Sequence, residues 1–260
     1  WRFDGWGGKG ATYYGHDDGL DDAVAETLAT ALEVPIFDAN VVMEGGAFDH
    51  NGKGTLLTTK NCLLDRQPHK DPGHHGPSQK ELEKRFETFL GISKVLWLNG
   101  VAFDGDDTDG HIDNLARFVS PTQIVTVVGN SPDDPLYAPL QENLSELNAA
   151  LDQDGNPFEV ISIPLPRPLY YQCTLEGVPG RWRYPASYAN FYIGNDVVLV
   201  PTYGDPNDRV ALNTLSECFP SRDVVGIDCS HYILGQGAIH CSTQQQPSTA
   251  QRGPALNQVA

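Results

Sequence analysis

The stretch IDNLARFVSPTQIVTVV, residues 112–128, contains the pattern that best predicts how this chain folds. Two apolar runs, Ile112–Val119 and Ile124–Val128, are separated by Ser-Pro-Thr-Gln, and a short polar break that contains proline is typical of a turn. We therefore predict a β-hairpin. The residues that follow, Leu136–Leu151, carry apolar side chains at helical spacing, which predicts a helix after the hairpin.

Similar segments recur on both sides of this hairpin. Ser78 and Glu81 have the spacing of a capping box, which marks the start of one further helix. A short apolar strand is expected after each helix, and then a hairpin. The other predicted helices are Asp17–Glu33, Ser78–Leu90 and Asn207–Phe219; the other hairpins join Asn40–Met43 to Thr55–Thr58 and Tyr188–Ile193 to Val197–Pro201; the last unit has the strand Val224–Ile227 followed by Tyr232–Cys241.

This order of elements predicts an α/β fold built from a repeated unit of one helix and three strands. The predicted helices start roughly 60 to 70 residues apart, although the units share negligible sequence identity. A chance alternation of helices and strands would look similar. We expect a single domain over residues 1–247, followed by a polar tail over residues 248–260.

The charge of the chain limits what it can bind. There are 34 acidic and 17 basic residues, which gives a net charge of −17. Such a chain repels nucleic acids and anionic membrane surfaces, and it attracts cationic ligands. Simple solubility is the alternative explanation. No apolar run approaches the roughly 18 residues of a membrane-spanning helix.

The cysteines and histidines give little sign of a metal site or of disulfides. The five cysteines are scattered and include no Cys-x-x-Cys pair, which favours a reducing, cytoplasmic location. His69, His74 and His75 lie in a loop rich in proline and glycine, without a carboxylate at helical spacing, so we expect no metal there. The acidic run Asp104–Asp109 lacks the ligand spacing of a calcium-binding EF-hand loop.

Four polar residues beside the predicted strands and turns are candidates for chemistry. Side chains two residues apart in a strand point to the same face, so His111 and Asp113 are predicted to share a pocket. Cys241 is a candidate nucleophile, which needs its thiolate form and a nearby cation. His111 is a candidate for that cation or for a proton shuttle, and Glu44 for the group that orients its ring. Each residue alone also fits a purely structural role.

Five strings of sequence, in this order and spread over nearly the whole chain, resemble the agmatine deiminase family. This family includes bacterial peptidylarginine deiminases and belongs to the pentein superfamily of enzymes that modify guanidino groups. The strings are WRFDGWGGK (residues 1–9), EGG (44–46), DTDGHIDN (107–114), SYANFY (187–192) and IHCSTQQQP (239–247).

The resemblance implies a pentein-type α/β propeller with five-fold pseudosymmetry, of which our units would make about four of the five blades. It implies the hydrolysis of agmatine to N-carbamoylputrescine and ammonia, a step toward putrescine and the polyamines, without metal or organic cofactor. A homo-oligomer is compatible with it. The family's upstream Arg-Asp-x-Gly-Pro segment, which supplies a second aspartate for the guanidinium, is absent, so we expect an N-terminally truncated domain.

The resemblance also implies a role for each candidate residue. Cys241 matches the nucleophile that attacks the guanidinium carbon, His111 the general acid and base, and Glu44 the carboxylate that pairs with this histidine. Asp113 matches a carboxylate that holds the guanidinium, and Asp107 a residue near the amine end of agmatine. The string DRQP at residues 65–68 departs from the family pattern, and we expect it to lie away from the chemistry.

Three alternatives stay open at this point. The first keeps the chemistry but replaces agmatine by free or peptidyl arginine, whose carboxylate would favour a cationic partner. The acidic run before His111 favours agmatine, whose distal amine is positive. The second is an inactive pentein remnant that serves as a binding or structural module. The third is a papain-like cysteine hydrolase of acyl groups, which would need an oxyanion hole and an orienting asparagine.

Overall fold

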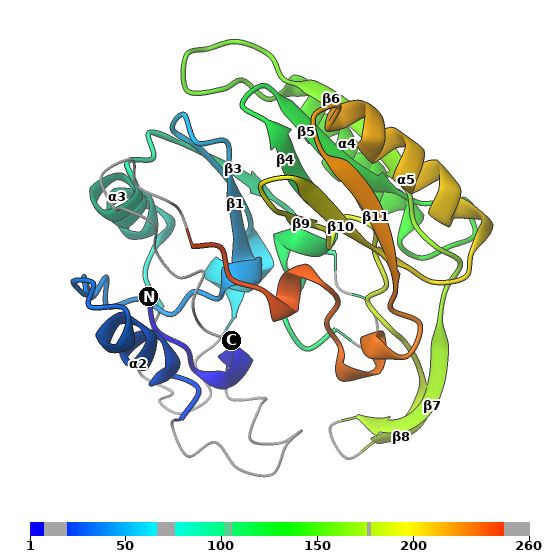
Figure 1. Ribbon diagram of the computed structural model, residues 1–260, viewed down its shortest axis with the longest axis horizontal. Helices are drawn as coiled ribbons and strands as arrows, with labels where there is room; N and C mark the ends of the chain where they lie inside the picture. Colours follow the sequence, from blue (N-terminus) through cyan, green and yellow to red (C-terminus); the bar gives the residue numbers. More distant parts are fainter. Residues whose placement is uncertain (8–19, 67–75, 102, 104–105, 176–177, 247–260) are drawn as a thin grey trace.

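Three small sheets and the helices between them form the body of the protein (Figure 1). The computed structural model describes residues 1–7, 20–66, 76–101, 103, 106–175 and 178–246. No helix of this described part is long and apolar enough to cross a membrane. The predicted loop histidines and the whole predicted polar tail lie outside the described residues.

The three sheets share one topology, which confirms the prediction of an α/β fold with a repeated unit of one helix and three strands. In each sheet two strands pair antiparallel, and a helix then leads to a third strand that runs parallel to the second. The units are β1 (Phe48–His50), β2 (Thr55–Thr59), α3 (Gln79–Leu90) and β3 (Lys94–Leu98); β4 (Ala116–Ser120), β5 (Gln123–Val128), α4 (Tyr137–Ala149) and β6 (Glu159–Pro164); β9 (Tyr192–Ile193), β10 (Val197–Thr202), α5 (Pro206–Cys218) and β11 (Asp223–Asp228).

Local sequence determines where these helices begin and end. Ser78 and Glu81 form the predicted capping box at the start of α3, and Gly91 ends this helix in a left-handed conformation with φ 68°. Asp205 caps α5 in the same way, with Pro206 in its first turn. Each helix then crosses back to the start of a parallel strand, as this pairing requires.

Two apolar clusters hold the units together. The larger one combines strands and helices of the second and third units, including the fully buried Ile124, Leu147, Val198 and Leu215. Helix α5 packs against both β11 of its own sheet and β6 of the preceding one, so it joins two units (Figure 1). The smaller cluster lies beneath α3 and includes Leu82 and Phe86.

Several predicted strands are tight turns instead. Residues 40–43 form only a single bridge from Val42 to Arg2, and the first hairpin begins at β1, within the segment predicted to be its turn. His111 precedes a 3₁₀ turn, η3 (Ile112–Asn114), and β4 starts only at Ala116. Two more 3₁₀ turns, η4 (Tyr232–Gly235) and η5 (His240–Ser242), follow β11.

The predicted first helix is shorter than expected in the described residues. Helix α2 (Val24–Ala31) has no buried residue, and Leu20, Val24 and Leu28 are 68%, 51% and 50% exposed. The described chain places no element over this apolar face. A further hairpin, β7 (Tyr170–Leu175) with β8 (Val178–Arg183), extends away from the body and was not predicted (Figure 1).

Candidate active site

The candidate residues lie at equivalent places in the repeated units. Glu44 and the 3₁₀ turn η1 (Gly45–Ala47) come directly before β1, as His111 and η3 come before β4. The turn η5, which carries Cys241, follows β11 and contacts η1, while η1 also contacts η3. The same connection in successive units therefore delivers the polar groups to one place.

Gly46 allows two of these groups to approach the backbone. A Cβ atom at this position would lie 2.5 Å from His111 Nδ1 and 2.7 Å from Asp113 Oδ2. Both distances are too short for a real Cβ contact, so only glycine fits. His111 and Asp113 thus face the same small space, as predicted, but they reach it from a 3₁₀ turn and not from one face of a strand.

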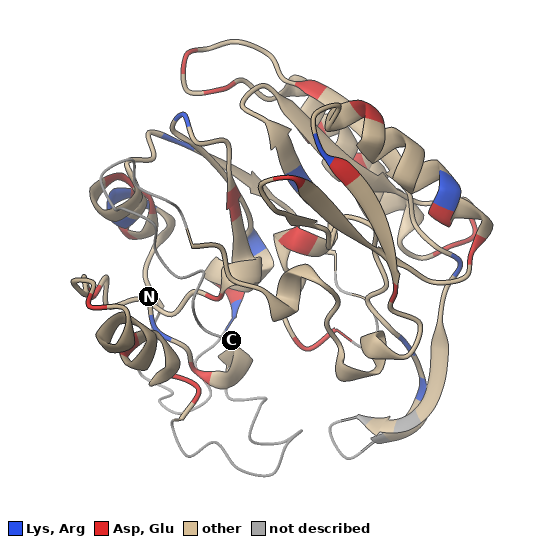
Figure 2. Ribbon diagram, in the orientation of Figure 1, with Lys and Arg blue, Asp and Glu red and all other residues tan. Residues whose placement is uncertain are grey.

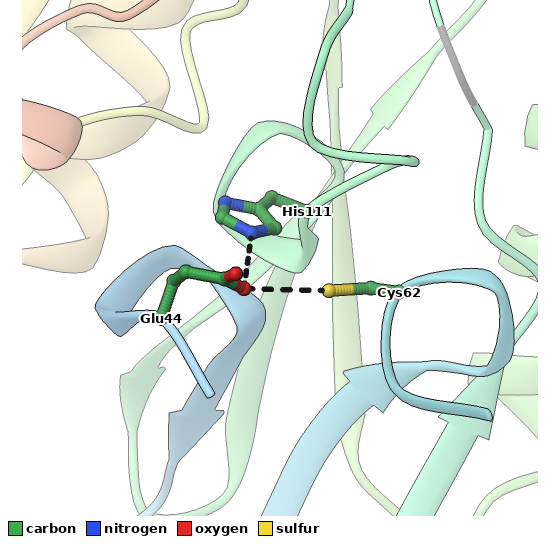
Figure 3. Close-up of side chains that lie close together, drawn as sticks. All are labelled: Glu44, Cys62 and His111. Carbon is green, nitrogen blue, oxygen red and sulfur yellow. Dashed lines mark hydrogen bonds and ion pairs between the residues drawn. The ribbon is translucent and has the colours of Figure 1, made fainter. Parts of the chain in front are cut away.

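Glu44 and His111 form a buried pair (Figure 3). His111 Nε2 lies 3.1 Å from Glu44 Oε2, which confirms that the two residues meet. Burial raises the pKa of Glu44, but its contacts with His111 and then with Arg66 outweigh this effect and lower the pKa to about 2. Glu44 is therefore a carboxylate at neutral pH, and it holds one nitrogen of the His111 ring.

The same contacts determine the charge of His111. Burial alone would lower the pKa of its imidazole, but Cys62 and the Glu44 carboxylate raise the pKa well above its ordinary value. His111 is consequently an imidazolium at neutral pH, with Nδ1 directed toward the space beside Gly46. A proton donor is thus held at this position.

Arg66 completes the pair, contrary to the expectation for residues 65–68. Its guanidinium forms an ion pair with Glu44, donates to the Thr108 carbonyl at 2.6 Å and reaches Asp109 at 3.1 Å. Arg66 directly follows the short π-helix η2 (Asn61–Asp65). Arg66, a position where the string keeps the family pattern, therefore lies against Glu44 and not away from the candidate site, while residues 67 and 68 lie outside the described residues.

Glu44, Cys62 and His111 also have the spacing of metal ligands. Their donor atoms all lie within 4.8 Å of one another, and all three residues are buried (Figure 3). Arg66 Nη2, however, lies 3.3 Å from the Cys62 sulfur, and the same guanidinium pairs with Glu44. A metal ion here would face this fixed positive charge, so these three side chains suit the Arg66 guanidinium better than a metal ion.

Cys241 lies on η5, with its sulfur between a donor and an acceptor. The Asn190 amide donates to Sγ at 3.1 Å, and Sγ lies 3.5 Å from Asp113 Oδ2. The residue as a whole is exposed, yet its sulfur is enclosed by these neighbours. Burial of the sulfur and the Asp113 carboxylate raise the pKa of the Cys241 thiol, which favours its protonated form.

Asp113 is fully buried and has one oxygen without a partner. Oδ2 accepts a hydrogen bond from His240 Nδ1 at 2.9 Å, whereas Oδ1 has no hydrogen-bond partner. Burial raises the pKa of Asp113, but His240 above all, and then His111 and Arg117, lower it below its ordinary value. Asp113 is therefore an ionised carboxylate whose Oδ2 lies near the Cys241 sulfur and whose Oδ1 has no hydrogen-bond partner.

Asn190 and His240 contact the predicted residues, and sequence reasoning gave neither of them a role. Asn190 Oδ1 accepts from the backbone nitrogens of His240 and Cys241, at 2.9 and 3.3 Å, while its amide donates to the sulfur. Both residues lie in strings that carried the family resemblance, SYANFY and IHCSTQQQP. Their place in these strings was the only available signal.

Asp107 is 4% exposed and lies in the bend that leads to His111. Glu44 contacts His111 and Asp113 contacts Cys241, and both His111 and Asp113 lie against Gly46. The role of Asp107 at the far end of a substrate stays a prediction.

An α/β scaffold here gathers a cysteine, a histidine–glutamate pair and a buried aspartate, the groups that a cysteine-dependent enzyme acting on a cationic substrate would need. The chain belongs to the Porphyromonas-type peptidyl-arginine deiminase family, whose model matches residues 1–247. The resemblance to agmatine deiminases is thereby confirmed.

Relatives and solved structures agree with this assignment. The chain is 37% identical to the agmatine deiminase of Medicago truncatula over 95% of its own length and 68% of the relative's. It resembles the structure of the Enterococcus faecalis agmatine deiminase with a TM-score of 0.82 at 33% identity, covering 95% and 68% of the two chains. It also resembles the structure of a Cys-to-Ser variant of the C. jejuni agmatine deiminase with substrate bound. There the TM-score is 0.78 at 31% identity, and the match covers 93% of this chain and 66% of that one. The chain thus spans about two thirds of the length of these proteins.

Proposed function

We propose that this chain is a guanidine hydrolase of the agmatine deiminase type, which converts agmatine and water to N-carbamoylputrescine and ammonia. The observation that carries the proposal is the buried Asp113, whose Oδ1 lacks a partner while its Oδ2 lies 3.5 Å from the Cys241 sulfur. A carboxylate held there binds a guanidinium N–H and brings the central carbon to the sulfur. Names of the relatives supply agmatine as the substrate.

Charge explains how the nucleophile is activated. In the empty site the Asp113 carboxylate and burial keep Cys241 protonated. A bound guanidinium offsets the charge of Asp113 and stabilises the thiolate, so the thiol loses its proton when substrate binds. The enzyme then holds a reactive thiolate only when there is a carbon to attack.

In the remaining steps, His111 acts first as proton donor and then as proton acceptor. Sγ of Cys241 bonds to the guanidinium carbon, and His111 gives its proton to the departing ammonia as the C–N bond breaks. The neutral imidazole then takes a proton from water, which attacks the same carbon. The C–S bond breaks and the thiolate is regenerated, the added oxygen releases its remaining proton to solvent, where ammonia is present, and the ureido product leaves. Glu44 holds the ring throughout at 3.1 Å.

At the level of the fold, we propose one catalytic domain over residues 1–247, in which the repeated units are blades of a pentein-type propeller. Their equivalent connections supply Glu44, His111, Asn190 and Cys241, which supports an arrangement around a common axis. Segment Ser187–Asn190 precedes β9, as η1 and η3 precede β1 and β4.

A second candidate substrate is peptidyl arginine, which the name of the matching family favours. The same sulfur and carboxylate would act on it, so the two substrates differ only in what surrounds the tail. The buried Asp107 precedes His111. An acidic group there suits the distal amine of agmatine and repels the carboxylate of free arginine.

The experiment is a measurement of ureido product from agmatine, free arginine and a blocked peptidyl arginine in parallel. The proposal expects turnover of agmatine above all, in agreement with an acidic end of the site. Turnover of the blocked peptide alone would show that the substrate is peptidyl arginine and not agmatine. The absence of ureido product from all three substrates would contradict the proposal and favour a folded but inactive module.

A further inference from the structure

His240 lies next to Cys241 in the chain, and its ring is bound to the carboxylate of Asp113. Nδ1 lies 2.9 Å from Asp113 Oδ2, and both residues are buried. An ionised carboxylate can only accept hydrogen bonds, so Nδ1 carries the hydrogen. The ring is therefore a fixed donor to one oxygen of Asp113.

This contact makes the two oxygens of Asp113 unequal. Oδ2 is engaged by His240 and faces the Cys241 sulfur at 3.5 Å, while Oδ1 is buried without a partner. A carboxylate rotates readily about its last bond, because this torsion has a broad two-fold preference. The bond from His240 removes that freedom and leaves Oδ1 in one defined position.

The backbone of His240 is fixed to the same turn as the nucleophile. Its backbone nitrogen donates to the Asn190 side chain at 2.9 Å and to the Asn190 carbonyl at 3.1 Å, and Thr243 donates back to the His240 carbonyl. The ring that orients Asp113 and the sulfur of Cys241 therefore belong to one rigid 3₁₀ turn. Any shift of η5 would move both together.

We propose that His240 is a positioning residue, which fixes the carboxylate of Asp113 so that its free oxygen places a cationic amidine or guanidine carbon against the Cys241 sulfur. The identity of the natural substrate rests on the proposed function, but the positioning itself requires only a planar cation that can donate to Oδ1. His240 acts through Asp113 and takes no part in bond making.

Other charged groups also face Asp113, and the test must separate them from His240. His111 and Arg117 both favour its ionised form, from the connection before β4 and from β4 itself. Within the described residues, neither of them hydrogen-bonds to Asp113, whereas His240 does. Changing the ring of His240 should thus leave a charged but rotatable carboxylate.

The experiment compares two alkylating agents of nearly equal shape, the cationic 2-chloroacetamidine and the neutral 2-chloroacetamide. In each case the Cys241 sulfur bonds to the methylene carbon and chloride leaves. Peptide mass spectrometry gives the labelling rate at Cys241, and the ratio of the two rates reports how well the site holds an amidinium. Turnover is not needed, so an inactive chain would contradict the proposed function without affecting this test.

Three variants of the whole chain separate positioning from general damage. His240→Asn keeps an amide nitrogen near the position of Nδ1, His240→Gln moves it toward the position of Nε2, and His240→Phe keeps the ring without a donor. We expect the rate ratio to fall about tenfold in the Phe and Gln variants, the scale of a lost charge-assisted hydrogen bond, and to stay within about threefold of the unchanged protein in the Asn variant.

Two results would overturn the inference. One is a ratio of the two labelling rates that equals the wild-type ratio in the Gln variant and in any folded Phe variant. This result would mean that the hydrogen-bond donor at the Nδ1 position is irrelevant. The other is an equal loss in the Asn and Gln variants, which would show that the ring is needed for packing and not for the bond from Nδ1.

Discussion

Gly46 controls the space in which His111 and Asp113 meet. We expect Gly46→Ala to lower kcat/KM at least about a hundredfold and to reduce the free energy of unfolding by roughly 1–3 kcal/mol, because the new methyl group overlaps both side chains. Gly45→Ala is the matched control, since its Cβ would meet only Gln244 Oε1, at 3.7 Å. Equal kinetics for the two variants would contradict this role of Gly46.

Glu44 is expected to set the upper limit of the active pH range. His111 must be protonated to release ammonia, and Glu44 raises its pKa, so activity is lost as the pH rises through that raised value. In Glu44→Gln the pKa of His111 falls, and the descending limb of the pH profile of kcat moves to lower pH. A limb at the wild-type pH, in a variant with unchanged circular dichroism, would show that another group titrates there.

At the residue scale, sequence alone identified Glu44, His111, Asp113 and Cys241 as candidates. It could not assign the contacts of Asn190, because the amide that reaches the Cys241 sulfur lies 51 positions earlier in the chain. Arg66 was misjudged for a similar reason, since only the folded turn before it brings its guanidinium to Glu44.

The elements that carry the site are turns, where the sequence pattern predicted a strand. Ile112–Val119 is mostly apolar, which favours a strand, yet the first three residues form η3. The Asn114 side chain accepts from Asn190 and its carbonyl accepts from Ser187, so long-range polar contacts replace strand pairing here. Helices α3, α4 and α5, in contrast, follow local periodicity and caps and were predicted to within two residues.

Arg117 of β4 joins the elements around the site. It is 2% exposed, pairs with Asp49 of β1 at 3.0 Å and donates to the Phe191 carbonyl at 2.9 Å, next to Asn190. We expect Arg117→Met to reduce the free energy of unfolding by about 3 kcal/mol, because it leaves a partly buried carboxylate without its partner.

The control for Arg117 is Arg167→Met, measured in the same denaturant titration. Arg167 also pairs with an aspartate, Asp205, at 2.7 Å, but its side chain is 73% exposed. Its removal should cost at most about 1 kcal/mol. Similar losses in the two variants would contradict the view that β4 is fixed to its neighbours by Arg117.

At the scale of the whole molecule, the net charge of −17 is expected to attract a cationic substrate. Figure 2 shows that acidic positions are spread along the ribbon over elements throughout the fold, and the sequence has half as many basic residues. Salt screens such attraction, since the Debye length is about 10 Å at 0.1 M. We expect kcat/KM for agmatine to fall several-fold between roughly 0.01 and 0.5 M salt, while labelling of Cys241 by neutral 2-chloroacetamide changes little. A parallel fall of both rates would exclude steering as the cause.

The repeated arrangement was predictable because each unit is local: a hairpin, a helix and a strand within a short stretch of chain. How the units gather their connections around one site was not, since no periodicity encodes contacts between η1, η3 and η5. For α2 the helical pattern correctly predicted a helix with an apolar face. The pattern did not indicate what packs on that face, which is exposed in the described residues.

The central claim, that Cys241 attacks the guanidinium carbon, is tested most directly by acid-quenched mass spectrometry of the protein during turnover of agmatine. We predict an adduct with the mass of agmatine less ammonia on the peptide that contains Cys241, formed and lost at rates that account for kcat, and neither adduct nor ureido product in Cys241→Ser. Steady turnover by a folded Cys241→Ser variant, or an adduct confined to another cysteine, would contradict the account.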